Sequence, residues 1–77
     1  MTIDPLGSEP VYLQLAAILR EQIRSGELQP DRPIPSLQRL VQMHGVARGT
    51  AAKAVGVLTA EGLVRIVPGK GAFVIRR

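Results

Sequence analysis

The side chains that could do chemistry in this sequence are mostly cations, and they are concentrated in its second half. Residues 37–77 carry seven basic side chains and one acidic one, for a net charge of +6, whereas residues 1–36 carry three basic and five acidic ones, for a net charge of −2. A local positive field on a small domain points to a polyanionic partner, with nucleic acid first and an anionic membrane surface second. A solvated basic face without a partner accounts for the charge equally well.

Other kinds of site are excluded by composition. The 77 residues include no Cys and a single His, His44, so neither a disulfide framework nor a thiolate or His-based metal cluster can form. No nucleophile, base and orienting group stand in a recognisable pattern, so we expect no enzyme, no cofactor and no metal. No apolar run approaches the roughly 18 residues of a membrane span, and no signal segment is recognisable, so we expect a cytoplasmic protein that does not enter a membrane.

The first element that positions the basic residues is a helix over about 9–25. Apolar residues recur at helical spacing from Val11 to Ile23, and Ser8 is the predicted N-cap. Residues 1–8 show no periodicity and are expected to be a flexible terminus. Three prolines between positions 29 and 35 exclude a helix there and favour a connector with one short extended piece at 32–34.

Two shorter helices follow, over about 37–43 and about 48–61. Ser36 is the predicted N-cap of the first of them, and Met43 is counted among its apolar positions. The inward positions of the second are Ala51, Ala54, Val55 and Leu58. A tight turn containing Gly joins the pair, which is typical of a helix-turn-helix.

Beyond Gly62 the hydrophobic period changes from helical to strand-like. Two β-branched, apolar runs flank Pro68-Gly69-Lys70-Gly71 and predict a hairpin over about 63–76. Three helices followed by a two-stranded hairpin make a mainly α fold, the winged helix-turn-helix, over residues 9–77.

Short runs in a fixed order along residues 9–75 resemble a known family. These runs are Pro10-Val11-Tyr12, Ser25-Gly26-Glu27-Leu28, Pro35-Ser36, Gly45-Val46 with Arg48 and Thr50, Glu61-Gly62-Leu63-Val64, and Gly69-Lys70-Gly71-Ala72-Phe73-Val74. Together they resemble the N-terminal DNA-binding domain of GntR-family bacterial transcription regulators. The resemblance implies a third helix in the major groove of DNA and a wing in the minor groove. It also implies an effector-binding and dimerising domain that is absent from this chain.

The resemblance also implies which residues contact DNA. The candidates are Ser36, Gln38, Arg39, Arg48, Gly49, Thr50, Lys53, Gly69, Lys70 and Gly71. Gln38 and Ala52 stand where the family usually has Arg, and Ala47 replaces a Ser cap. Arg39 and Lys53 are the neighbouring basic residues, but one position along a helix is a rotation of about 100°.

Elementary chemistry gives several of these residues a role of their own. Arg48, in the first turn of its helix, can pair bidentately with guanine, and Thr50 can bond a phosphate or contact a thymine methyl. Ser36 can cap its helix and donate to a phosphate. The remaining phosphate anchors are Arg39, Lys53 and Lys70. Gly56, inside a predicted helix, costs about 1 kcal/mol relative to Ala for no reason visible in the sequence.

The expected function is sequence-specific binding of double-stranded DNA by a bacterial regulator, a repressor of a palindromic operator. We expect two copies on DNA or in the full-length protein, and a monomer for the isolated domain. The alternative is a winged-helix module that binds proteins, because fold does not dictate function. Leu13, Leu37 and Val57, near the polar sides of their helices, would then form the partner surface.

Overall fold

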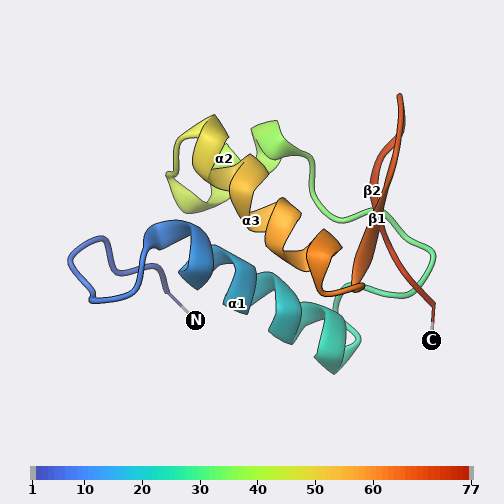
Figure 1. The fold of residues 1–77 in the computed structure, drawn as a ribbon, viewed down its shortest axis with the longest axis horizontal. Helices are drawn as coiled ribbons and strands as arrows, with labels where there is room; N and C mark the ends of the chain where they lie inside the picture. Colours follow the sequence, from blue (N-terminus) through green and yellow to red (C-terminus); the bar gives the residue numbers. More distant parts are fainter. Residues whose placement is uncertain (1, 77) are drawn as a thin grey trace.

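A computed structural model describes residues 2–76 of the chain. It contains three helices and one antiparallel hairpin (Figure 1): α1 (Val11–Ser25), α2 (Leu37–His44), α3 (Arg48–Ala60), β1 (Val64–Val67) and β2 (Gly71–Val74). The predicted order of three helices and a terminal hairpin is confirmed. None of the helices among the described residues is long and apolar enough to cross a membrane.

The core lies between α1 and α3, the most extensively packed pair of helices. Leu15 and Leu19 of α1 and Leu58 of α3 are completely buried. Ala51 and Ala54 are also fully buried, and their small side chains let the two helix backbones approach closely. The four inward positions predicted for α3 are all buried, so its predicted packing face is confirmed.

The start of α1 differs from the prediction. The helix begins at Val11 rather than at residue 9, and its N-cap is Pro10, whose extended backbone (ψ 146°) keeps Ser8 and Glu9 outside the helix. No side chain caps the first turn, but the amide of Gln14 holds the preceding segment: its Nε2 donates to the carbonyl oxygens of Glu9 (2.7 Å) and Asp4 (2.8 Å), and its Oε1 accepts from the Asp4 N–H. These bonds fold the segment before α1 back onto the helix.

The helix α2 is short and contributes a single fully buried side chain, Leu40. Leu37 and Val41 are half-buried on the same side. Met43 was expected at an apolar position but is 53% exposed. The inward side of α2 continues from Leu40 and Val41 to His44, and Met43 is rotated away from His44 by about 100°. Gly45 then closes the helix with φ +64°, and its N–H donates to the carbonyl of Val41.

The connector between α1 and α2 joins the hairpin as an extra edge. The N–H of Ile34 donates to the carbonyl of Ala72 (2.9 Å), and the N–H of Val74 donates to the carbonyl of Arg32 (2.9 Å). The predicted extended piece at 32–34 is therefore confirmed. Buried Ile34, together with Val64 and Val74 of the two strands, fastens the hairpin to the helical core.

Candidate nucleic-acid interface

Three pieces of the fold that carry the predicted binding residues lie on one side of the molecule. Figure 1 shows α2, the first turn of α3 and the tip of the hairpin on the side away from α1. Nine of the ten candidates are exposed, and the tenth, Thr50, is half-buried. The turn between α2 and α3 is only three residues long, so the starts of these helices are held in fixed relation to each other.

The charges are sorted by pairing. Within the described part of the chain, the ion pairs join Arg20 to Glu61, Arg24 to Glu21 and Arg76 to Asp31. No acidic side chain of residues 2–76 pairs with the cations of the candidate interface. Those cations are Arg39, Arg48, Lys53 and Lys70. Arg77, which contributes to the charge of the second half, lies outside the described residues.

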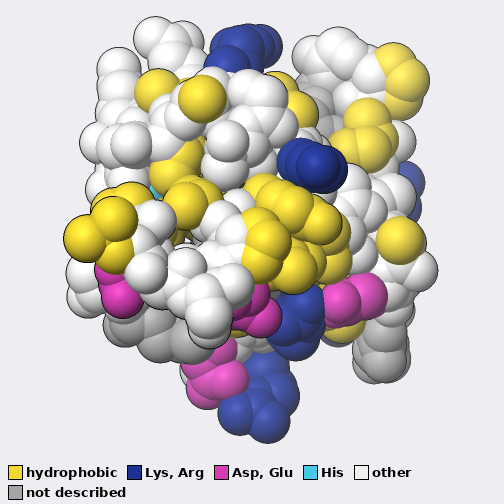
Figure 2. All heavy atoms as spheres, turned by 60° about the vertical axis from the view of Figure 1, so that its left-hand side comes forward, with side chains coloured by type: hydrophobic (Ala, Val, Ile, Leu, Met, Phe, Trp, Pro, Cys, Tyr) yellow, Lys and Arg dark blue, Asp and Glu magenta, His cyan; other side chains and the backbone are white. Residues whose placement is uncertain are grey.

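The same sorting is visible on the surface. Figure 2 keeps the vertical axis of Figure 1, and its acidic side chains all lie in the lower half, where α1 is found. Lys and Arg side chains also occur higher up, on the side of α2 and the hairpin tip, with no acidic group beside them in that view. In this view the positive charge without an acidic neighbour therefore lies mainly on the side away from α1, an arrangement that attracts a polyanion.

The two helix starts on this side are capped differently. Ser36 is the N-cap of α2, as predicted, and its Oγ accepts a hydrogen bond of 3.1 Å from the N–H of Arg39. The N-cap of α3 is Ala47, which offers no side-chain acceptor. The first-turn N–H groups of α3 near Arg48 and Gly49 are therefore not satisfied by a capping side chain.

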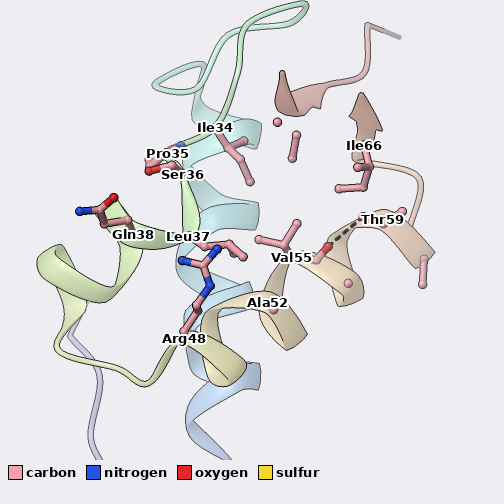
Figure 3. A pocket seen from close by; sticks show the side chains of 14 residues that line it. Ile34, Pro35, Ser36, Leu37, Gln38, Arg48, Ala52, Val55, Thr59 and Ile66 are labelled. Carbon is pink, nitrogen blue, oxygen red and sulfur yellow. Dashed lines mark hydrogen bonds between the residues drawn. The ribbon is translucent and has the colours of Figure 1, made fainter. Parts of the chain in front are cut away.

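An apolar hollow of about 790 Å³ is lined by residues of α2, α3, the hairpin and the connector before α2. Its lining includes Ser36, Gln38, Arg48 and Gly71, so four of the predicted residues border one space. Figure 3 shows the Arg48 side chain pointing from the first turn of α3 into this hollow, toward Leu37, whereas Gln38 points away from it.

The hollow also has walls that sequence reasoning did not assign to the site. Ile66 of β1, which is 56% exposed, lies across from α3 in Figure 3. The α3 wall includes Ala52, Gly56 and Thr59, and the Thr59 hydroxyl donates to the carbonyl of Val55 (3.0 Å). The signals available in the sequence were an Ile in a predicted strand and small residues at i, i+4 spacing, but the space between them depends on tertiary packing.

Two predicted residues of α3 face the other way, toward α1 and the segment before it. Thr50 lines a smaller recess together with Ile3, Val11 and Val46. The Nζ of Lys53 lies 4.4 Å from the centroid of the Tyr12 ring, a cation–π contact. Lys53 thus has a partner within the molecule but remains exposed to an incoming anion.

The hairpin tip is built by backbone conformation. Gly69 (φ +77°) and Gly71 (φ +113°) both occupy positive φ, which side-chain-bearing residues rarely adopt, in the turn of the predicted hairpin. The N–H of Lys70 between them donates to the carbonyl of Val67 (2.9 Å), so the turn is tight and its Lys side chain is exposed at the tip.

The three residues named for the alternative function are all half-buried. Leu37 and Val57 pack against the core, and Leu13 lies on α1. Among residues 2–76, no group of three His, Asp or Glu side chains could hold a metal ion.

Comparison with known proteins identifies the fold and the family. The chain is similar to the DNA-binding domain of AraR, solved "in complex with operator ORX1", with a TM-score of 0.86 and 37% identity over 96% of this chain and 92% of that one. It is also similar to "YtrA from Sulfolobus acidocaldarius, a GntR-family transcription factor", with a TM-score of 0.85 and 34% identity over all of this chain and 65% of that one. The predicted winged helix-turn-helix is therefore confirmed.

Among curated proteins, the chain is similar to the "HTH-type transcriptional repressor NagR" of Bacillus subtilis, with 39% identity over 74 residues. That match covers 96% of this chain and 30% of NagR, so the chain spans less than a third of its relative's length. Residues 11–74 match the family described as "Bacterial regulatory proteins, gntR family". A family of regulators also confirms the prediction that the chain is not an enzyme. By the match over most of its length, the chain belongs to the gntR family of bacterial regulatory proteins.

Proposed function

We propose that this chain is the DNA-binding domain of a bacterial transcriptional repressor and that it recognises a double-stranded operator. The observation that carries the proposal is the distribution of ion pairs: Arg39, Arg48, Lys53 and Lys70 have no acidic partner within residues 2–76, whereas Arg20 and Arg24 of α1 are both paired. Relatives named as a repressor and as a domain in complex with an operator support it.

The proposed docking places the start of α3 in the major groove and the hairpin tip at the adjacent minor groove. An α-helix fits the major groove, and the N-terminal residues of a recognition helix reach the base edges. Arg48, exposed in the first turn of α3, pairs with guanine. Ser36 and Arg39 at the start of α2 and Lys70 at the tip bind phosphates, while Gly69 and Gly71 allow the backbone to approach the strand.

The remaining candidates take supporting roles. Gln38 points away from the hollow and binds the sugar–phosphate backbone or an adenine edge. Gly49, beside Arg48, lets the α3 backbone come close to the bases. Thr50 and Lys53 meet phosphate on the α1 side of α3, where Lys53 keeps its contact with Tyr12.

Two copies of the domain bind one palindromic operator, with half-sites about one helical turn apart. The regulator continues beyond this domain with a part that binds an effector and dimerises, a proposal that the greater length of NagR supports. The isolated domain is a monomer and the protein acts in the cytoplasm. Sedimentation should then give one domain on a half-site duplex and two on the full palindrome.

The test is selection of duplexes from a random pool followed by fluorescence anisotropy at several salt concentrations. We expect one sequence motif to be enriched and its affinity to fall steeply with salt, by about 0.9 in log–log slope for each phosphate contact. Lys70→Ala should reduce that slope by about one contact. Arg24→Ala, which removes an exposed cation paired with Glu21 near α1, is the matched control and should leave the slope unchanged.

Two results would contradict specific DNA binding by this domain. One is that selection enriches no sequence motif, and the other is that the affinity is identical for all duplexes and insensitive to salt.

A further inference from the structure

The outward surface of α3 is nearly free of long side chains over its first turns. Gly49, Ala52 and Gly56 are all exposed there, and they follow one another at intervals of three and four residues, which puts them on one side of the helix. Arg48 and Lys53 are the long side chains on either side of this strip, and Lys53 is drawn toward Tyr12.

The packing of the protein does not require these small residues. A Cβ built on Gly49 or on Gly56 meets nothing within 4 Å apart from the helix's own backbone, so larger side chains would fit within the domain itself. Neither glycine has a positive φ. Packing within the domain therefore does not explain the two glycines, and beside them the Ala52 methyl is exposed at the edge of the hollow that Arg48 also lines.

The strip formed by Gly49, Ala52 and Gly56 can distinguish bases only by apolar contact. It has no donor to pair with the N7 and O6 acceptors of guanine and no side-chain amide to pair with adenine. It offers apolar contact and close approach, and the base feature that matches these is the 5-methyl group of thymine in the major groove. Resting on the proposed function, we propose that Ala52 is a specificity-determining residue that selects thymine by contact between its methyl group and the thymine methyl.

The position of Ala52 locates that thymine relative to Arg48. The two residues are one turn apart on the same side of α3, about 6 Å along the helix axis, which is less than two base-pair steps. A guanine contacted by Arg48 therefore has the selected thymine within about two base pairs of it.

The experiment replaces thymine by uracil, which lacks the methyl group but keeps the same pairing, at each thymine of the selected duplex in turn. We expect the affinity to fall about fourfold at one thymine in each half-site, the factor for one buried methyl-sized group. On a half-site duplex, which binds one domain, Ala52→Gly should bind the thymine form as weakly as the wild-type domain binds the form with uracil at that position, and should no longer distinguish the two.

Ala60→Gly is the matched control, because Ala60 is an exposed alanine in the last turn of the same helix. It also borders the hollow, but it lies eight residues, or about 12 Å along the helix axis, beyond Ala52. The Ala60→Gly variant should keep the full preference for thymine, and circular dichroism should show both variants folded. The proposal is overturned if uracil is tolerated at every position, or if Ala52→Gly retains the preference. Either result leaves sequence-specific binding intact, whereas failure to enrich any motif overturns the proposed function and this inference together.

Discussion

Arg20 of α1 and Glu61, the residue directly after α3, are joined by two parallel hydrogen bonds. The Nε of Arg20 donates to Oε1 of Glu61 (2.8 Å), and Nη2 donates to Oε2 (2.6 Å). This bidentate pair ties the middle of the first helix to the point where the third helix ends and the hairpin begins. It thereby contributes to fixing the angle between the helices and the wing, on the side away from the candidate interface.

The Arg20–Glu61 pair should make stability depend on pH. The hydrogen bond from Arg20, helped by its charge, holds the pKa of the Glu61 carboxyl below its ordinary value of 4.5 and raises the pKa of Arg20. Because the folded-state pKa of the carboxyl is lowered, its contribution is complete above the ordinary value and is lost as pH falls through the folded-state pKa. Urea midpoints of wild type and Glu61→Gln should therefore differ at pH 7 and converge toward pH 3.

Salt provides the control for this pair. Both side chains remain about 40% exposed (41% and 38%), so the difference at pH 7 should shrink when the ionic strength is raised. A difference that stays constant from pH 7 to pH 3 would contradict the assigned role of the carboxylate.

Truncation of Leu40 should detach α2 from the core. Leu40 is the one fully buried side chain of this helix, and Leu40→Ala should cost about 2–5 kcal/mol of unfolding free energy, a large part of the stability of a small domain. Met43→Ala on the same helix is the control and should change it by less than about 0.5 kcal/mol, since Met43 is 53% exposed. Equal losses in the two variants, measured by thermal or urea unfolding, would refute the assigned packing of α2.

Two glycine substitutions should have opposite signs. Gly56 lies inside α3 with open space around it, so Gly56→Ala should raise the free energy of unfolding by about 0.5–1 kcal/mol. Gly45 has equally open space but a φ of +64°, so Gly45→Ala should lower it. Denaturant titration of both variants compares backbone conformation at constant side-chain change, and stabilisation by both would show that the turn between α2 and α3 is assigned the wrong geometry.

Arg48 and Lys70 should affect DNA binding differently. Arg48→Ala should cost about 1–3 kcal/mol on the selected duplex and relax the preference at one base pair, because its guanidinium reads a base. Lys70→Ala should weaken all duplexes alike, because an ammonium at the hairpin tip meets phosphate. Anisotropy against a panel of single-base variants separates the two patterns, and the same pattern for both residues would argue against the proposed docking.

Much of this fold could be predicted from local patterns. The helical period of apolar residues predicted α1 and α3. Ser36 indicated the start of α2, and the glycines of Pro68-Gly69-Lys70-Gly71 indicated the hairpin turn. Caps and turns are predictable in this way because they depend on a few neighbouring residues. The start of α1 was mispredicted, because the extended backbone of Pro10 keeps Ser8 and Glu9 outside the helix, and a residue before a proline disfavours helical geometry.

The candidate site was less accessible to sequence reasoning than the fold. The identities of its cations and glycines could be taken from a family resemblance, but their surroundings are tertiary. The cation–π contact between Lys53 and Tyr12 and the hollow between α3 and Ile66 arise from segments far apart in the chain. Nothing in the sequence explained a glycine at position 56 of a helix. Only the structure shows that Gly56 faces outward, with open space around it.

The central claim, that the starts of α2 and α3 and the hairpin tip form the DNA-binding surface, is tested most directly by NMR. Amide shifts of the domain should be followed as the selected duplex is added. We expect the largest changes at residues 36–39, 48–53 and 69–71, and small ones along α1 from residue 13 to 24. Changes concentrated on α1, or absent from all three predicted segments at saturating duplex, would contradict the account.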